Sequence, residues 1–432
     1  MLDKIKNLGQ VAAAKTKYRK KNGEHYLVAL DIGTENVKAL IGRIVEDGIE
    51  IVGAGRAHQE LSDMQAGAIA DIAAVVGNCD KALAAAEQQA GISARTAVIG
   101  IAGELVKGTT TTVRAQRKDP EKALDTDEVE RIVNAVQQRA QARAKQELIW
   151  ELGGKEVDVR LVNSAVVNMN IDGYTVSNPI GFQGKEVQIE LYTAYAPLIH
   201  IGALERTAKE LDLDLLAVAA EPFAVARSVI GNDPNASMSA ILMDVGGGTT
   251  DIAVINDGGV QGTKMFGIGG RAFTKSVERD LGVEFTQAEE FKLGLSDNHT
   301  PRAKVPAVEA ALKKTLDVWT SGVELALAEF TKLDHLPHQL LLCGGGSSLD
   351  MLMEKLEESK WYASLPFTKR PVVKHIQPKQ VVGIIDKSGQ VADHTFITAM
   401  GLLRVGLDTL MQDSQTAATG TIKERLNRIL KV

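Results

Sequence analysis

The sequence Asp244-Val245-Gly246-Gly247-Gly248-Thr249-Thr250-Asp251 decides the fold of this 432-residue chain. Aliphatic segments at 240–245 and 250–255 predict two buried strands joined by a glycine turn. Three consecutive glycines between acids and threonines have little use in packing, and an ordinary tight hairpin is better served by Asn-Gly. Main-chain N–H groups in such a turn approach phosphate oxygens closely, because no Cβ stands in the way. The turn therefore predicts a phosphate-binding site.

A shorter version of this motif, Asp31-Ile32-Gly33-Thr34, follows an aliphatic segment near the start of the chain. Alone, it fits an ordinary hairpin as well as a phosphate site. Its repetition of acid, glycine and hydroxyl predicts two duplicated lobes that face each other across a cleft. Asp31 and Asp244 are then suited to bind Mg²⁺ through its water molecules. Lys38, on the strand that follows, would neutralise phosphate charge.

A third glycine cluster, Gly344-Gly345-Gly346-Ser347-Ser348, separates an apolar strand at 339–343 from a helix expected at 349–356. A strand, a glycine turn and a helix N-terminus together let a nucleoside lie on the main chain. The chain has no GxxxxGK[ST] loop and no GxGxxG that opens a helix, which disfavours P-loop and Rossmann proteins. The hairpins are therefore expected to grip the phosphates.

The composition limits the class of protein. Apolar residues make up 44% and aromatic residues only 4%, so aliphatic side chains must fill the core, as in α/β layers. The net charge of −6 argues against a general nucleic-acid-binding protein. Cys79 and Cys343 lie far apart and form no disulfide framework, which fits a reducing cytoplasm. No run approaches the ~18 apolar residues that a membrane-spanning helix needs.

The order and spacing of the three glycine motifs resemble the actin, Hsp70 and sugar-kinase ATPase superfamily, and within it the FtsA family of bacterial cell-division proteins. The resemblance covers residues 27–410 and the tail. Four further segments carry the narrower match: Asp172-Gly173 with Asn178-Pro179-Ile180-Gly181, Glu221-Pro222-Phe223-Ala224, Gly267-Ile268-Gly269-Gly270, and Ala288-Glu289-Glu290-Phe291-Lys292. It implies an α/β, actin-like ATPase fold with two lobes of duplicated ribonuclease-H-like subdomains and an inserted α+β subdomain.

The resemblance also implies a domain order. The expected parts are a basic leader at 1–25, a first nucleotide-binding lobe at 26–95 and 164–218, the insert at 96–163, a second nucleotide-binding lobe at 219–271 and 336–410, its outer subdomain at 272–335, a tether at 411–420 and an amphipathic helix at 421–432. The leader departs from the family pattern. It is left open as a second lipid-binding element or a solvated arm.

ATP and Mg²⁺ are the implied ligands. Asp31 and Asp244 would hold the metal. Glu221 would stand near the water that attacks the γ-phosphate, or would only stabilise the start of its helix through the dipole. A weak ATPase activity is left open. The implied nucleotide contacts are Asp31, Gly33, Thr34 and Lys38; Gly246, Gly247, Gly248, Thr249 and Thr250; and Gly269, Gly270, Glu289, Lys292, Gly344, Gly345, Gly346 and Ser347.

The C-terminal segment at 421–432 predicts an amphipathic helix that binds membranes. Its four aliphatic residues fall on one helical face and its basic residues populate the other. About 1 kcal/mol of attraction to anionic lipid per basic residue supports reversible binding. A frayed end, or a helix packed on the body, is the alternative. The expected membrane-binding residues are Ile422, Lys423, Arg425, Leu426, Arg428, Ile429, Leu430 and Lys431.

The predicted function is that of a cell-division protein that binds ATP, polymerises into actin-like filaments and tethers the FtsZ ring to the membrane. Its expected place is the cytoplasmic face of the cell membrane at the division site. The expected partners are the FtsZ C-terminal tail, further copies of the chain, other divisome proteins and anionic lipid, but no nucleic acid. A pilus or secretion assembly adaptor and a small-molecule kinase of the same superfamily remain alternatives.

Overall fold

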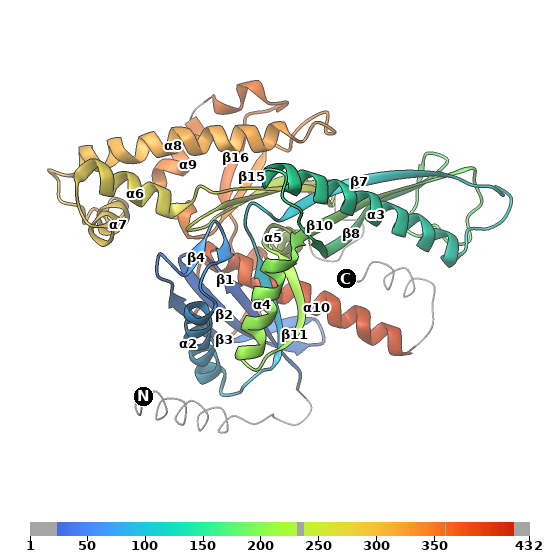
Figure 1. Cartoon of the computed structure of the whole chain (residues 1–432), viewed down its shortest axis with the longest axis horizontal. Coiled ribbons are helices and arrows are strands. Elements are labelled where there is room, and N and C mark those ends of the chain that lie inside the picture. The colour runs from blue at the N-terminus through green and yellow to red at the C-terminus, as the bar shows by residue number, and fades with distance from the viewer. Residues whose placement is uncertain (1–23, 231–236, 359, 419–432) are drawn as a thin grey trace.

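A computed structural model describes residues 24–230, 237–358 and 360–418, and these form two lobes with an inserted subdomain beside them (Figure 1). The first lobe is built on a six-stranded sheet of order β11-β6-β1-β2-β3-β17. These strands are β1 (Tyr26–Ile32), β2 (Asn36–Val45), β3 (Gly48–His58), β6 (Thr96–Ile101), β11 (Asp214–Ala220) and β17 (Ile384–Asp386). A small hairpin of β4 (Met64–Gln65) and β5 (Ala68–Ile69) follows β3.

Helices cover the first sheet. Helix α2 (Ile72–Ala90) packs against β2 and β3, and α10 (Ile397–Ala418) packs against β1 and β6. Local signals explain α2: the Asp71 carboxylate accepts a hydrogen bond from the Ala74 N–H at its start, and Gly91 closes its end at φ 68°. Helices α4 (Leu198–Glu210) and α5 (Glu221–Ile230) complete this lobe.

The second lobe repeats the first. Strands β12 (Ala240–Val245), β13 (Thr250–Asn256) and β14 (Gly259–Phe266) form an antiparallel meander, as β1 to β3 do. Strand β15 (Gln339–Cys343) runs parallel to β12, as β6 runs parallel to β1, and β16 (Val372–His375) lies at the edge. This duplication, with helices packed on both sheets, confirms the predicted α/β, actin-like fold.

The second lobe has its own hydrophobic core. It is surrounded by α6 (Gly270–Leu281), α7 (Phe285–Leu293), α8 (Val305–Ala328) and α9 (Asp350–Glu358). Trp319 of α8 is fully buried, and its indole N–H donates to Thr250 Oγ1 at 2.8 Å. That bond ties the start of β13 to the helical layer.

The inserted subdomain consists of helix α3 (Thr126–Glu151) and strands β7 (Lys107–Gln116), β8 (Val159–Ile171), β9 (Tyr174–Thr175) and β10 (Glu186–Pro197). Strand β7 pairs with β14 of the second lobe, which makes one nine-stranded sheet. The expected insert at 96–163 is therefore wrong at both ends: β6 belongs to the first lobe, and the insert continues through β10. Strand pairing is a long-range property, so an alternating pattern does not reveal which sheet a strand joins.

The C-terminal helix α10 also differs from expectation. The expected tether at 411–420 is wrong for residues 411–418, whose backbone continues α10. That polar stretch contains neither glycine nor proline, the residues that most disfavour a helix interior. The expected amphipathic helix at 421–432 and leader residues 1–23 lie outside the described residues. Over the described part of the chain, no helix has the length and apolar character needed to cross a membrane.

The junction between β7 and β14 depends on Gly108. A Cβ there would lie 1.9 Å from Thr263 Oγ1 and 2.6 Å from the Tyr192 hydroxyl oxygen. We expect Gly108→Ala to lower the free energy of unfolding by about 1–3 kcal/mol, as overpacked sites do. Urea denaturation measures the change. Gly77→Ala is the control, because a Cβ at this exposed position of α2 would meet nothing within 4 Å. This substitution should stabilise the helix by about 0.5–1 kcal/mol. Unchanged stability of Gly108→Ala would contradict the tight junction.

Candidate functional site

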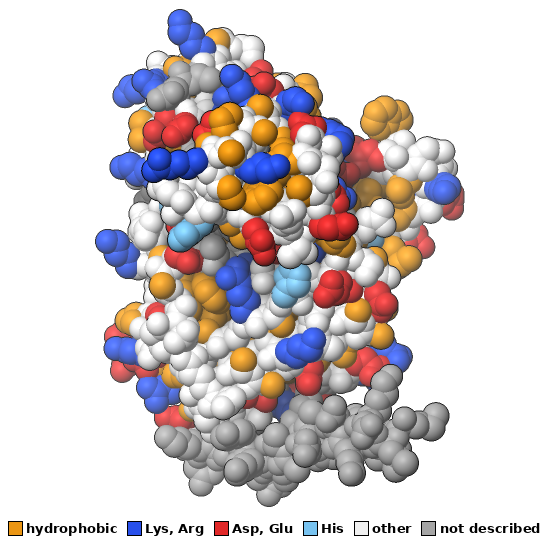
Figure 2. Space-filling model, turned by 90° about the vertical axis from the view of Figure 1, so that its left-hand side faces the viewer, with side chains coloured by type: hydrophobic (Ala, Val, Ile, Leu, Met, Phe, Trp, Pro, Cys, Tyr) orange, Lys and Arg blue, Asp and Glu red, His pale blue; other side chains and the backbone are white. Residues whose placement is uncertain are grey.

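A cavity of about 680 Å³ lies between the two lobes, within the size range of small-molecule sites. The β1–β2 hairpin lines it from the first lobe. The β12–β13 hairpin, the starts of α6 and η1 (Gly345–Ser348), and the end of α7 line it from the second. On the face in Figure 2, basic and acidic side chains of the described residues are interspersed rather than gathered into one broad basic field.

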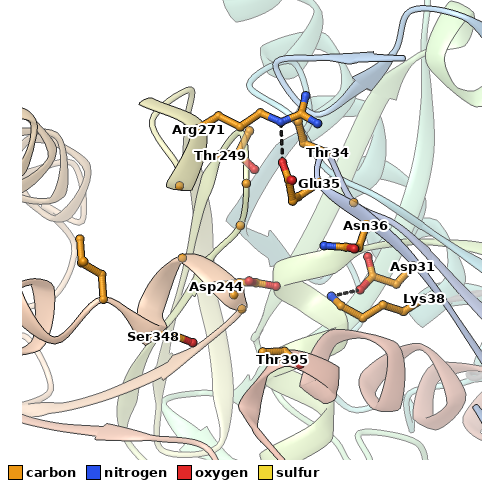
Figure 3. Close-up of a pocket in the computed structure, with 18 of the residues that line it drawn as sticks. Asp31, Thr34, Glu35, Asn36, Lys38, Asp244, Thr249, Arg271, Ser348 and Thr395 are labelled. Atoms are coloured by element: carbon orange, nitrogen blue, oxygen red, sulfur yellow. Dashed lines mark hydrogen bonds and ion pairs between the residues drawn. The ribbon is translucent and has the colours of Figure 1, made fainter. Parts of the chain in front are cut away.

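The first hairpin holds a buried ion pair. Lys38 Nζ lies 3.0 Å from Asp31 Oδ2, and both side chains face the cavity (Figure 3). Burial acts to lower the pKa of Lys38, but the carboxylates of Asp31 and Asp244 outweigh it and raise that pKa above its ordinary value. The side-chain amide of Gln59 donates to the Gly33 carbonyl at 2.7 Å and fixes the turn. The hairpin therefore presents a permanent cation to the cleft.

The second hairpin is tied to the start of α6. The Gly246 N–H donates to the Thr249 carbonyl at 2.9 Å and closes the turn. The main-chain N–H groups of Gly270 and Arg271 donate to the carbonyls of Gly246 and Gly247 at 2.9 and 2.8 Å. These bonds hold the glycine turn rigidly at the edge of the cavity.

Four carboxyl groups are buried around the cavity, on Asp31, Glu221, Asp244 and Asp251. Burial, and then the charges of Asp31 and Asp251, raise the pKa of Glu221 well above its ordinary value. Burial, and then the charge of Asp244, raise the pKa of Asp251 in the same way. Lys38 alone does not balance this group, so the site favours an added cation.

The donor set fits a hydrated Mg²⁺. Oδ1 of Asp251 is buried and has no hydrogen-bond partner, which makes it a free acceptor beside the cavity. Across residues 24–230, 237–358 and 360–418, no three acidic, histidine or cysteine side chains are grouped closely enough to hold a metal ion by themselves. Mg²⁺ usually keeps several water ligands and binds through one or two carboxylates and substrate phosphates, so the unpartnered Asp251 oxygen suits its hydration shell.

The far end of the cavity is open to a larger group. At Gly345 an added Cβ would meet no atom within 4 Å, so this part of η1 leaves free space in the cavity. On α7, Lys292 Nζ lies 2.8 Å from Glu289 Oε2 and donates to Thr274 Oγ1 at 2.9 Å. This end of the cavity is therefore lined both by polar side chains and by glycine main chain that no side chain covers.

The structure brings together most of the residues predicted from the sequence. The predicted residues that line the cavity are Asp31, Gly33, Thr34, Lys38, Glu221, Asp244, Gly246, Gly247, Thr249, Gly270, Glu289, Lys292, Gly344, Gly345 and Gly346.

Four predicted residues do not line the cavity and instead support its walls. Thr250 Oγ1 donates to the Ile268 carbonyl at 2.7 Å, and Ser347 Oγ donates to the Gly344 carbonyl at 2.7 Å. Gly269 packs against the Gly246 carbonyl, where a Cβ would lie 2.6 Å away. Gly248 faces Thr34 across the cleft.

No sequence motif predicted the residues that connect the two lobes. Arg271 of α6 forms an ion pair with Glu35 at 2.7 Å (Figure 3). Its guanidinium also donates to the Gln59 carbonyl at 3.0 Å. No local motif marks Arg271, because its partners lie more than 200 residues away. Asp251, in contrast, stands inside the quoted glycine motif, so its place beside the turn was an available signal.

The acidic cluster leads to a pH-dependent prediction. Because the pKa of Glu221 is raised on folding, the unfolded chain releases this proton first, near pH ~4.3. Stability therefore falls as the pH rises from that value through the raised pKa. We expect Glu221→Gln to raise the melting temperature of the ligand-free protein at pH 8 but much less at pH 5. Each kcal/mol of relief corresponds to roughly 2–4 °C in a domain of 150–250 residues.

Differential scanning calorimetry at the two pH values tests this expectation. Glu205→Gln is the matched control, since that exposed carboxylate forms a surface ion pair with Arg160 and should change stability by only about 0.5 kcal/mol or less. An equal effect of Glu221→Gln at pH 5 and pH 8 would show that its charge does not strain the cleft.

Comparisons with known proteins agree with this architecture. The family described as cell division protein FtsA matches residues 241–401. The chain is 24% identical to the cell division protein FtsA of Pseudomonas aeruginosa, with 91% of this chain and 92% of that protein covered. It is 26% identical to FtsA of Neisseria meningitidis, with 93% and 95% covered.

Among solved structures, a chain of the PilM-PilN type IV pilus biogenesis complex superposes with a TM-score of 0.63 at 16% identity. The match covers 88% of this chain and 98% of that one. At this identity the likeness concerns the fold. The family match over residues 241–401 and the similarity over most of the chain show that this chain resembles the FtsA cell-division proteins, and its fold is the actin-like one.

Proposed function

We propose that this chain binds ATP with Mg²⁺ in the cleft, assembles into actin-like filaments and tethers the FtsZ ring to the cytoplasmic membrane. One observation carries the nucleotide part: two glycine hairpins from different lobes and four buried carboxyl groups converge on a single cavity of about 680 Å³. Similarity to the FtsA cell-division proteins supports the role in cell division.

The hairpins would hold the phosphates. Gly33 and Gly246 bring main-chain groups to the cavity without a Cβ, and Thr34 adds a hydroxyl donor. The Thr249 hydroxyl instead donates to Asp251 Oδ2 at 3.0 Å. Lys38 supplies a cation at the base of the first hairpin. Bound Mg²⁺ would offset the charge of the phosphates and of the acidic cluster. Asp31 and Asp244 would face it through water, and Asp251 Oδ1 would accept a hydrogen bond from its hydration shell.

Glu221 is the candidate for orienting or deprotonating a water molecule. It starts α5, lines the cavity and has a raised pKa. A raised pKa makes the carboxylate a stronger proton acceptor, which suits general-base chemistry. The same carboxyl also packs closely over Gly100, where a Cβ would lie 2.7 Å from Oε1, so its position is well defined. Slow hydrolysis of ATP is part of the proposal.

Membrane tethering rests on the sequence pattern at 421–432, which follows closely on the end of α10 at Ala418. A single short amphipathic helix binds lipid weakly. A filament presents many such helices side by side, and the raised effective concentration retains all of them. Polymerisation and membrane attachment therefore support each other in this proposal.

Gly345→Val tests the nucleotide site. The new side chain would occupy open cavity space, so we expect at least a tenfold loss of Mg-ATP affinity, about 1.4 kcal/mol, with an unchanged melting temperature. Isothermal titration calorimetry on the full chain gives the affinity, and Gly77→Ala serves as a control that should bind like wild type. If the folded wild-type protein takes up neither ATP nor ADP, the proposal fails.

Leu426→Glu tests the membrane helix, because it places a charge on the apolar face of the segment. Asn427→Glu adds the same charge away from that face and is the matched control. In sedimentation with phosphatidylglycerol vesicles and ATP, we expect Leu426→Glu to remain in the supernatant while Asn427→Glu still pellets. Equal binding by the two variants would remove the helix from the proposal.

The partner is tested separately. Immobilised FtsZ C-terminal tail peptide should retain the full chain. Retention by a pilus-assembly membrane-protein segment instead would favour the adaptor function over the cell-division role.

A further inference from the structure

Arg56 stands in an unusual electrostatic position. It lies on β3 directly opposite Lys38 of β2, and both residues line the cavity. Like charges that face each other across neighbouring strands destabilise a sheet. Asp31 neutralises Lys38 at 3.0 Å, but Arg56 forms no hydrogen bond or ion pair with any residue that the structure describes. The pairing therefore leaves a free guanidinium at the cavity.

The other basic residues of the cavity are already engaged. Arg271 pairs with Glu35 at 2.7 Å, and Lys292 pairs with Glu289 at 2.8 Å. Of the basic residues that line the cavity in the described part of the chain, Arg56 is therefore the one that has no carboxylate partner. Asp393 lies near enough for Arg56 to help lower its pKa, but its carboxylate accepts hydrogen bonds from the main-chain N–H and the hydroxyl of Thr395.

We propose that Arg56 binds a phosphate oxygen of the nucleotide and forms a second phosphate-binding cation beside Lys38. This inference rests on the proposed ATP binding. A guanidinium offers paired N–H donors that match two phosphate oxygens, which the single ammonium group of Lys38 does not. A bound phosphate would also relieve the repulsion between the opposed cations Lys38 and Arg56. Relief of that repulsion would add to the free energy of binding.

A structural role for Arg56 would give a different result. Since its side chain is exposed and makes no bond in the described structure, its removal should leave the fold intact. Loss of the guanidinium should instead weaken only those ligands that carry phosphate. Comparing ligands that carry phosphate with ligands that lack it therefore distinguishes a structural role of Arg56 from a phosphate-binding role.

Calorimetric titration of the full chain with Mg-ATP, Mg-tripolyphosphate and adenosine tests the inference. We expect Arg56→Gln to weaken Mg-ATP and Mg-tripolyphosphate about tenfold, equivalent to about 1.4 kcal/mol, and to leave adenosine affinity unchanged. Arg56→Lys should recover part of the loss, because it keeps the charge without the paired donors. Arg160→Gln, which removes an exposed arginine that does not line the cavity, should bind like wild type.

Two outcomes would overturn the inference while ATP binding itself stands: Arg56→Gln binds Mg-ATP as tightly as Arg160→Gln, or it loses adenosine affinity by the same factor as Mg-ATP. If the wild-type chain binds neither Mg-ATP nor Mg-tripolyphosphate, the proposed nucleotide site fails together with the role of Arg56.

Discussion

Negative charge buried around the cavity between the lobes is the constraint on which this molecule depends. Asp31, Glu221, Asp244 and Asp251 are buried around one cavity, and charged carboxylates in such surroundings repel each other strongly. The fold supplies partial compensation: Lys38 pairs with Asp31, and the Thr398 hydroxyl at the start of α10 donates to Asp244. The remaining excess would favour a bound cation, and a cation held there would relieve the repulsion and so stabilise the fold.

Short-range sequence patterns predicted the parts of the fold and site that are built locally. The turn at Gly246 lies between two strands, and the turn at Gly344 follows a third, that were expected at nearly the same residues, since glycines and aliphatic runs mark both the turn and its flanks. The duplicated lobes followed from the repeated motif.

Features that depend on distant pairing were not predictable in this way. Nothing near Arg271 or Thr395 in the sequence indicates that either residue reaches the cleft. The pairing of β7 with β14 joins segments about 150 residues apart, so the limits of the insert had to come from the structure. Composition misled at residues 411–418, where a polar stretch suggested a tether but the backbone remains helical.

The β7–β14 pairing has a mechanical consequence. The inserted subdomain leaves the first lobe after β6 and returns to it at α4, yet its own strand is hydrogen-bonded into the sheet of the second lobe. It therefore acts as a strut between two bodies. Any rotation of the lobes that opened the cleft would therefore either bend the continuous sheet at Gly108 and Thr263 or carry the whole insert along with the second lobe.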